Sequence, residues 1–187
     1  SRLKTLAKTP AKLLQPMVSE GSSPTDCEEE GAQMAASEAL DQLIELADQA
    51  VQKTLQYFEG PGAQSAARVD RWGVWEVAAH MLFWHRATTE AALAVGQGGP
   101  ALYHTISVDA INEDAVGKTA GSTLADIVAQ LKQSHQELIK AIRALPNPDA
   151  VLMYRADGSA PTGKDRMRTI ARHWTGHLEA LQAAAGP

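Results

Sequence analysis

The sequence predicts an all-α domain built from four helices. Apolar residues recur at three- and four-residue steps in four long segments, and Gly or Pro residues mark the ends of most of them. No convincing alternating strand interrupts these segments. With 187 residues, of which 44% are hydrophobic, the chain is long enough for one domain with a substantial core. No apolar run approaches the eighteen or so residues that cross a bilayer, so no membrane span is expected.

The first 34 residues differ in composition from the rest. Four basic residues are the only charges before Glu20, namely Arg2, Lys4, Lys8 and Lys12. The stretch from Glu20 to Asp48 then carries nine acidic residues and no basic one. Leucines among the basic residues are compatible with a surface-docking helix or a targeting remnant, whereas Pro10 and Pro16 favour a partly ordered tail. We therefore expect a variable N-terminal arm over residues 1–34 and the bundle domain over residues 35–187.

The first two helices follow this arm. The apolar repeat of the first extends from Leu40 to Phe58, where Gly60 and Pro61 break it. The second is expected from about Gly73 to Val95, before a glycine-rich stop.

The last two helices have clearer ends. Thr123 and Asp126 have the spacing of a capping box, so the third helix is expected to begin at residue 122 or 123 and to end before Pro146. The fourth runs from about Gly163, shortly after Pro161, to Ala185.

Three histidines on these helices are candidates for a metal site. His173 and His177 lie four residues apart, so they share one face of the fourth helix. The apolar repeat of the fourth helix places His177 at a position where a core residue is expected. His80 lies beside the apolar repeat of the second helix. Each ring can instead bond to a backbone carbonyl, a Tyr or a carboxylate. Coordination of one metal ion would give all three buried rings a partner. It would also leave one coordination position of the ion open, as in catalytic sites. Gly176 adds weight, since a mid-helix Gly often marks close approach by another group.

The segment WGVWEVAAHMLFW, residues 72–84, resembles the second-helix signature of the DinB-like superfamily, with His80 at the position of its ligand histidine. Residues 110–112 resemble the short segment that follows this helix, residues 131–145 its third helix, and RHWTGHLEAL its fourth-helix ligand pair. The resemblance covers about residues 36–185. It implies a four-helix bundle with long crossover connections, often a homodimer, that holds a divalent metal on three side chains.

Members of this superfamily include thiol-dependent transferases and maleylpyruvate isomerases. The mycothiol-dependent isomerase branch usually has Glu where this chain has His173, so the chain is more similar to the DinB and bacillithiol-transferase branch. With three neutral imidazoles, a bound ion keeps its full charge and can lower the pKa of a water or thiol. Zn²⁺ or Ni²⁺ is expected, with Fe²⁺ as a further option, and a low-molecular-weight thiol is a possible second cofactor.

Charge and cysteine content exclude other classes. A net charge of −5 and a pI near 5.7 argue against nucleic-acid binding, which the resemblance does not imply either. Cys27 is the only cysteine and is followed by three glutamates, so neither an internal disulfide nor a thiolate cluster can form and its thiolate is disfavoured. A cytoplasmic protein that acts on a small molecule is the expectation.

Other polar residues carry weaker expectations. Glu76, one turn before His80, is a candidate catalytic residue that could orient His80 or move protons, although its charge also suits the start of a helix. His85 should face solvent or another helix, and His104 should lie in a loop. His135 should lie at the core boundary or, as the less favoured alternative, form a fourth polar group in the core. A basic cluster begins the fourth helix and could bind carboxylates, although a solvated face is favoured: Lys164, Arg166, Arg168 and Arg172. Three residues of the long connections cannot be ranked as substrate ligands: Tyr103, Asn112 and Tyr154.

Two function classes remain open from the sequence. The first is a metal-dependent enzyme of the thiol S-transferase, isomerase or hydrolase type. The second is a non-catalytic bundle that binds a small molecule or acts in stress, in which the histidines hold a structural metal or merely fill the core.

Overall fold

A computed structural model describes residues 24–186, with side chains from residue 39 onward. The predicted all-α class is confirmed. The helices are α1 (Pro24–Glu59), α2 (Val74–Gly96), α3 (Val108–Lys118), α4 (Leu124–Arg143) and α5 (Gly163–Ala185), with a short 3-10 helix, η1 (Pro61–Gln64), after α1. Four pairs of residues form short strands: β1 (Arg68–Val69), β2 (Trp72–Gly73), β3 (Leu102–Tyr103) and β4 (Met153–Tyr154).

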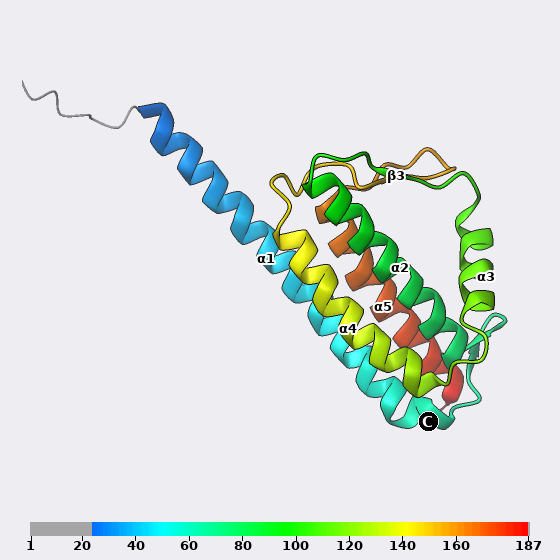
Figure 1. Cartoon of the computed structure of the whole chain (residues 1–187). Coiled ribbons are helices and arrows are strands. Elements are labelled where there is room, and N and C mark those ends of the chain that lie inside the picture. The colour runs from blue at the N-terminus through cyan, green and yellow to red at the C-terminus, as the bar shows by residue number, and fades with distance from the viewer. Residues whose placement is uncertain (1–23, 187) are drawn as a thin grey trace, which may run out of the picture. The chain divides into compact units, whose positions relative to one another are not determined.

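The bundle is formed by α2, α4, α5 and the part of α1 that follows residue 35 (Figure 1). Ion pairs fix the direction of α1 against α4: Asp41 near the start of the described side chains bonds Arg143, and Glu59 at the end of α1 bonds Lys132. The two helices are therefore antiparallel. The Thr54 hydroxyl, which is 2.9 Å from the Ala50 oxygen of its own helix, also lies 3.4 Å from the backbone oxygen of Trp174, so α5 lies beside α1.

The start of α4, which the sequence marks with a capping box, is confirmed. The Thr123 hydroxyl accepts the Asp126 amide at 3.1 Å, and the Asp126 carboxylate accepts the Thr123 amide at 3.0 Å. Thr162 and Asp165 make the same reciprocal pair at the start of α5. Each box satisfies two amides that the helix itself cannot bond, so both helices begin at a fixed residue.

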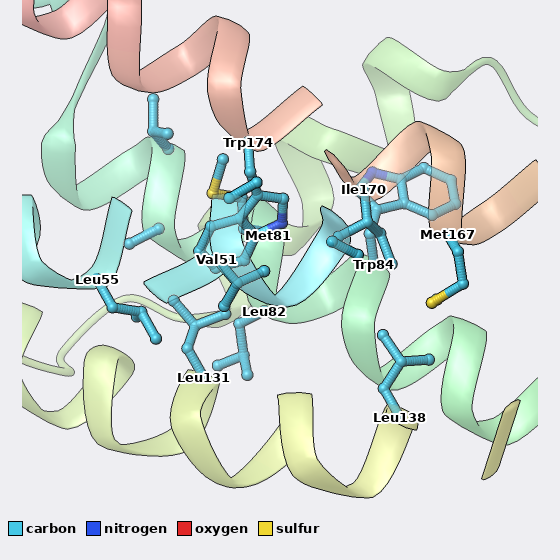
Figure 2. Close-up of a cluster of buried hydrophobic side chains, with 14 of the residues drawn as sticks. Val51, Leu55, Met81, Leu82, Trp84, Leu131, Leu138, Met167, Ile170 and Trp174 are labelled. Atoms are coloured by element: carbon cyan, nitrogen blue, oxygen red, sulfur yellow. The ribbon is translucent and has the colours of Figure 1, made fainter. Parts of the chain in front are cut away.

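The bundle core is apolar and closely packed. Trp174 of α5 is fully buried among side chains of the other helices, including Val51 of α1, Met81 of α2 and Leu131 of α4 (Figure 2). A second part of the same core lies around Trp84, where Ile170 and Met167 of α5 approach from one side. The apolar seam of the last helix therefore faces inward as its periodicity predicts.

The two long connections contain more regular structure than the sequence indicates. The connection after α2 includes β3 and then α3, whose N-terminus is capped by the Ser107 hydroxyl. The connection after α4 includes β4, which pairs with β3 in parallel. Tyr103 and Tyr154 stack with ring centroids 4.8 Å apart on this pair, so the two connections are joined at one end of the bundle (Figure 1).

Residues 1–23 of the expected N-terminal arm lie outside the described residues, and the side chain of Cys27 does too. The boundary between residues 34 and 35 stays a prediction. Across the part of the chain that the structure describes, no helix is both long and apolar enough to span a membrane.

Candidate metal centre

The structure brings His80, His173 and His177 together between α2 and α5. His80 lies on the second turn of α2, and the other two lie one turn apart near the middle of α5. One ring nitrogen from each lies within 4.8 Å of the other two. The juxtaposition that the sequence predicts from i, i+4 spacing and the position of His80 is therefore present, and the three rings can hold a metal ion.

The nitrogen separations suit a small divalent cation. His80 Nε2 lies 3.4 Å from His173 Nε2, and His173 Nε2 lies 2.8 Å from His177 Nε2. Zinc binds imidazole nitrogen at about 2.0–2.1 Å, so two ligands of a tetrahedral site lie about 3.3 Å apart. The first distance matches this value, and the second requires a small rotation of one ring.

The surroundings of His80 select the nitrogen that faces the other rings. His80 Nδ1 lies 3.3 Å from the backbone oxygen of Glu76. A carbonyl oxygen only accepts, so Nδ1 carries the proton and Nε2 presents its lone pair to the site. Trp72 of β2 packs against the same ring at 4.8 Å between centroids. Both contacts hold the imidazole in the orientation that a metal ligand needs.

The three imidazoles are neutral at physiological pH. Burial lowers the pKa of His80 to about 3 and that of His173 to about 4, with a further lowering from the neighbouring imidazoles. Burial also lowers the pKa of His177. Neutral rings leave their lone pairs free, so protons do not compete with a cation at neutral pH.

The centre lies at the rim of the core. His173 and His177 are half-buried, whereas the flanking Trp174 and Leu181 are fully buried. The expectation that His177 occupies a core position is therefore corrected: the ring faces a cavity of about 330 Å³. That cavity is lined by the three histidines and by Val69, Asp70, Arg71, Trp72, Val77, Asp109 and Asn112.

Gly176 does not mark a close approach, contrary to expectation. It is exposed, and a Cβ added there would meet no heavy atom within 4 Å among the described residues. The space beside this glycine is open.

Glu76 directs its carboxylate toward the start of α2. Its Oε2 accepts the Gly73 amide at 3.0 Å, and its Oε1 lies 3.6 Å from Arg68. Contact with His80 comes from the Glu76 backbone oxygen and not from the carboxylate. Its assignment as a catalytic residue stays a prediction.

His85 and His135 form a second histidine pair in the core. His85 Nε2 lies 3.3 Å from His135 Nδ1, and His135 Nε2 lies 3.0 Å from Asp48 Oδ1. His85 faces another helix, one of its two expected directions. His135 is only 2% exposed, so it lies in the core, the less favoured of its two expected positions, and not at the boundary. The reason is that Asp48 of α1 offers it a partner, which the sequence of α4 alone cannot reveal.

The basic residues at the start of α5 divide into two groups. Arg168 pairs with Asp165 on the surface, and Lys164, whose side chain is 13% exposed, pairs with the exposed Asp149. Arg166, in contrast, is 3% exposed, which corrects the expected solvated face for this residue. Arg172 is exposed beside His173.

Sequence reasoning missed several residues that border the metal centre. Asp70 and Asp109 carry carboxylates into the lining of the cavity, and Arg71 flanks them. Asp70 occupies the turn between β1 and β2 with φ of 54°, the left-handed region that Asp tolerates better than most residues. Two residues separate the strands of this hairpin, and this spacing was the one feature of the sequence that could have indicated it. The strands themselves are too short for periodicity to identify them.

A comparison with protein families assigns the chain. The model of the DinB superfamily matches residues 46–181, which include all three histidines and most of the bundle. No curated protein and no solved structure matches the chain. The chain belongs to the DinB superfamily.

Proposed function

We propose that this protein is a metal-dependent enzyme that acts on a small molecule, most simply as a thiol-dependent S-transferase or isomerase, or as a hydrolase. One observation carries the proposal: nitrogens of His80, His173 and His177 converge within 4.8 Å of one another. Three protein ligands with a further position left open are the usual arrangement of catalytic zinc sites.

The position of the centre favours catalysis over a structural metal. A structural site is closed by four protein ligands, and the described residues near the three histidines offer no fourth His, Cys, Asp or Glu within the same group. The rings instead border a cavity of about 330 Å³ that a small molecule can enter. These two features support an enzyme more than a non-catalytic bundle.

The chain's own residues would prepare this centre for reaction. A divalent ion held there would supply Lewis-acid chemistry, which activates a thiol or water nucleophile at neutral pH. His80 is held by the Glu76 carbonyl and by Trp72, so its orientation is fixed before a ligand arrives. Asp70 and Asp109 are the carboxylates in the cavity lining and are candidates to accept a proton from the substrate.

The metal and the second cofactor belong to the same proposal. All-nitrogen ligands suit Zn²⁺ and Ni²⁺, and Fe²⁺ as a further option. A low-molecular-weight thiol is the proposed cosubstrate, a homodimer the proposed assembly and the cytoplasm the proposed compartment. Glu76 is retained as a weaker catalytic candidate, since its carboxylate bonds the start of α2.

The function is tested by comparing wild type with His177→Ala in thiol conjugation to chlorodinitrobenzene, using a panel of low-molecular-weight thiols. We expect turnover by the metal-loaded wild type and a loss of about 100-fold or more in His177→Ala, with helix content by circular dichroism unchanged. Thr175→Ala, an exposed change on the same helix, is the matched control and should retain activity. Equal turnover by His177→Ala would refute the catalytic role.

A further inference from the structure

A second cavity of about 380 Å³ adjoins the metal centre. Asn112 and His173 line both cavities, so the two share a wall. The remaining lining is unusually cationic: Arg155, Arg166 and Arg172 surround Trp84, Val108 and Thr169. Among the described side chains, no carboxylate oxygen lies within 4.0 Å of any of these three guanidinium groups.

Arg166 is the most informative of the three. It is 3% exposed, and its Nε donates to the Thr88 hydroxyl at 3.1 Å. A guanidinium has five N–H donors, and this is the hydrogen bond that the structure gives it. Burial lowers the pKa of Arg166 to about 9, so it remains charged at neutral pH. A buried cation without an anion is costly, and such groups are normally paired.

Arg155 adds a second cation from the connection between β4 and α5. Both guanidinium groups lie over the ring of Trp84, at 5.1 Å for Arg155 and 5.4 Å for Arg166. The Arg155 Nε is buried and has no hydrogen-bond partner. Burial lowers the pKa of Arg155, and Asp157 opposes this lowering without forming an ion pair, so the mutual repulsion of the two cations is not neutralised.

The cations and the metal centre lie along one strip between α2 and α5. Arg166 precedes His173 by seven residues, two turns, so the two share a face of α5 with Cα atoms about 10 Å apart. The facing strip of α2 comprises His80, Trp84 and Thr88, each four residues from the next. Thr88 bonds Arg166 at one end, and His80 meets His173 at the other.

We propose that this cavity binds a carboxylate of the small-molecule ligand, with Arg166 and Arg155 as its anchor and the ligand's reactive end directed to His80, His173 and His177. The inference deepens the proposed function, and rests on it only for the direction of the reactive end. A planar guanidinium matches the two oxygens of a carboxylate. Trp84, whose Nε1 donates to Asn112 Oδ1 at 2.7 Å, would form a fixed apolar wall beside it.

Binding of succinate by calorimetry to the metal-free protein at low ionic strength tests the anchor. We expect succinate to bind wild type, and succinamide, its neutral analogue, to show no binding. Arg166→Gln and Arg155→Gln should each weaken succinate binding by about tenfold or more, because each removes a charged hydrogen-bond partner. Arg168→Gln should bind like wild type, because Arg168 is exposed on the same helix and pairs with Asp165.

Melting temperatures separate an anchor from a structural arginine. If Arg166 is an anchor, Arg166→Gln removes an unpaired buried charge, and its melting temperature should be no lower than that of wild type. If Arg166 has a structural role, the loss of its hydrogen bond should lower the melting temperature. If Arg166→Gln does not fold, the succinate affinity of Arg155→Gln tests the anchor instead, because Arg155 lies in the connection between β4 and α5 and not in a bundle helix. His177→Ala should still bind succinate, so failure of the metal proposal is distinguishable from failure of the anchor.

The source of the carboxylate is resolved on the metal-loaded protein with succinate and mercaptosuccinate. A gain in affinity for mercaptosuccinate alone supports a carboxylate carried by the thiol cosubstrate, and equal affinities support one carried by the other substrate. Equal responses to succinate and succinamide, or wild-type binding by both glutamine variants, would overturn the proposal.

Discussion

At the residue scale, the metal centre depends on imidazoles that are kept neutral and oriented. Burial disfavours their charged forms, and the Glu76 carbonyl fixes the tautomer of His80. Sequence spacing could identify these residues because i and i+4 positions share a helix face in any helix. It could not identify Arg166 or His135 as buried, because their burial depends on Trp84 and Asp48 from other helices.

Gly176 provides a residue-scale prediction. A Cβ at this exposed mid-helix position meets no heavy atom of the described residues within 4 Å. Gly176→Ala should therefore raise the free energy of unfolding by about 0.5–1 kcal/mol, because Ala has less backbone entropy than Gly to lose on folding. Urea denaturation of the metal-free protein measures it.

Gly163→Ala is the matched control at the start of α5. There a Cβ would lie 2.9 Å from both the Leu145 side chain and the Pro148 oxygen, so this change should destabilise. A loss of stability in Gly176→Ala would instead indicate that another group occupies the space beside Gly176.

At the element scale, the four bundle helices could be predicted because each combines an apolar repeat with local end signals. Thr123 and Asp126 fix the start of α4 from sequence alone. The connections could not be predicted in the same way. Helix α3 has only two buried residues, Ile111 and Ala115, too few for a recognisable stripe. Strands β3 and β4 have two residues each, and their pairing is set by contacts across 51 positions of the chain.

Three bundle helices are also joined by a polar chain that sequence periodicity does not reveal. It runs from the Met81 carbonyl through His85 and His135 to Asp48, with separations of 3.2, 3.3 and 3.0 Å. Two neutral rings carry two N–H groups, one fewer than the three contacts need. Burial lowers the pKa of both histidines, which opposes the third proton although Asp48 favours it for His135. These polar contacts therefore link α2, α4 and α1, but when both histidines are neutral one of the three contacts has no proton to share.

At the scale of the whole molecule, the histidines set the pH dependence of stability. The pKa of His80 and of His85 is about 3 and that of His173 about 4 in the folded protein, against an ordinary value of 6.5. The unfolded chain therefore binds more protons below pH 6.5. The stability of the metal-free protein should be fully present above pH 7 and fall as the pH drops toward 4, by up to about 1.4 kcal/mol per pH unit for each group.

Urea denaturation at pH 7.5, 6.5 and 5.5 measures this slope. The carboxylates with lowered pKa values, including Asp126 and Asp165, have an ordinary value of 3.8 and do not contribute in this window. A stability that stays constant or rises as the pH falls from 7.5 to 5.5 would contradict the account.

The central claim is that His80, His173 and His177 hold one cation between α2 and α5. Elemental analysis of the untagged protein after exposure to Zn²⁺, Ni²⁺ or Fe²⁺ and removal of free ions tests it most directly. The account predicts about one tightly held ion per chain in wild type and none in the variant in which all three histidines are replaced by Ala. Wild-type protein that retains no ion after loading, or a triple variant that retains as much, would contradict it.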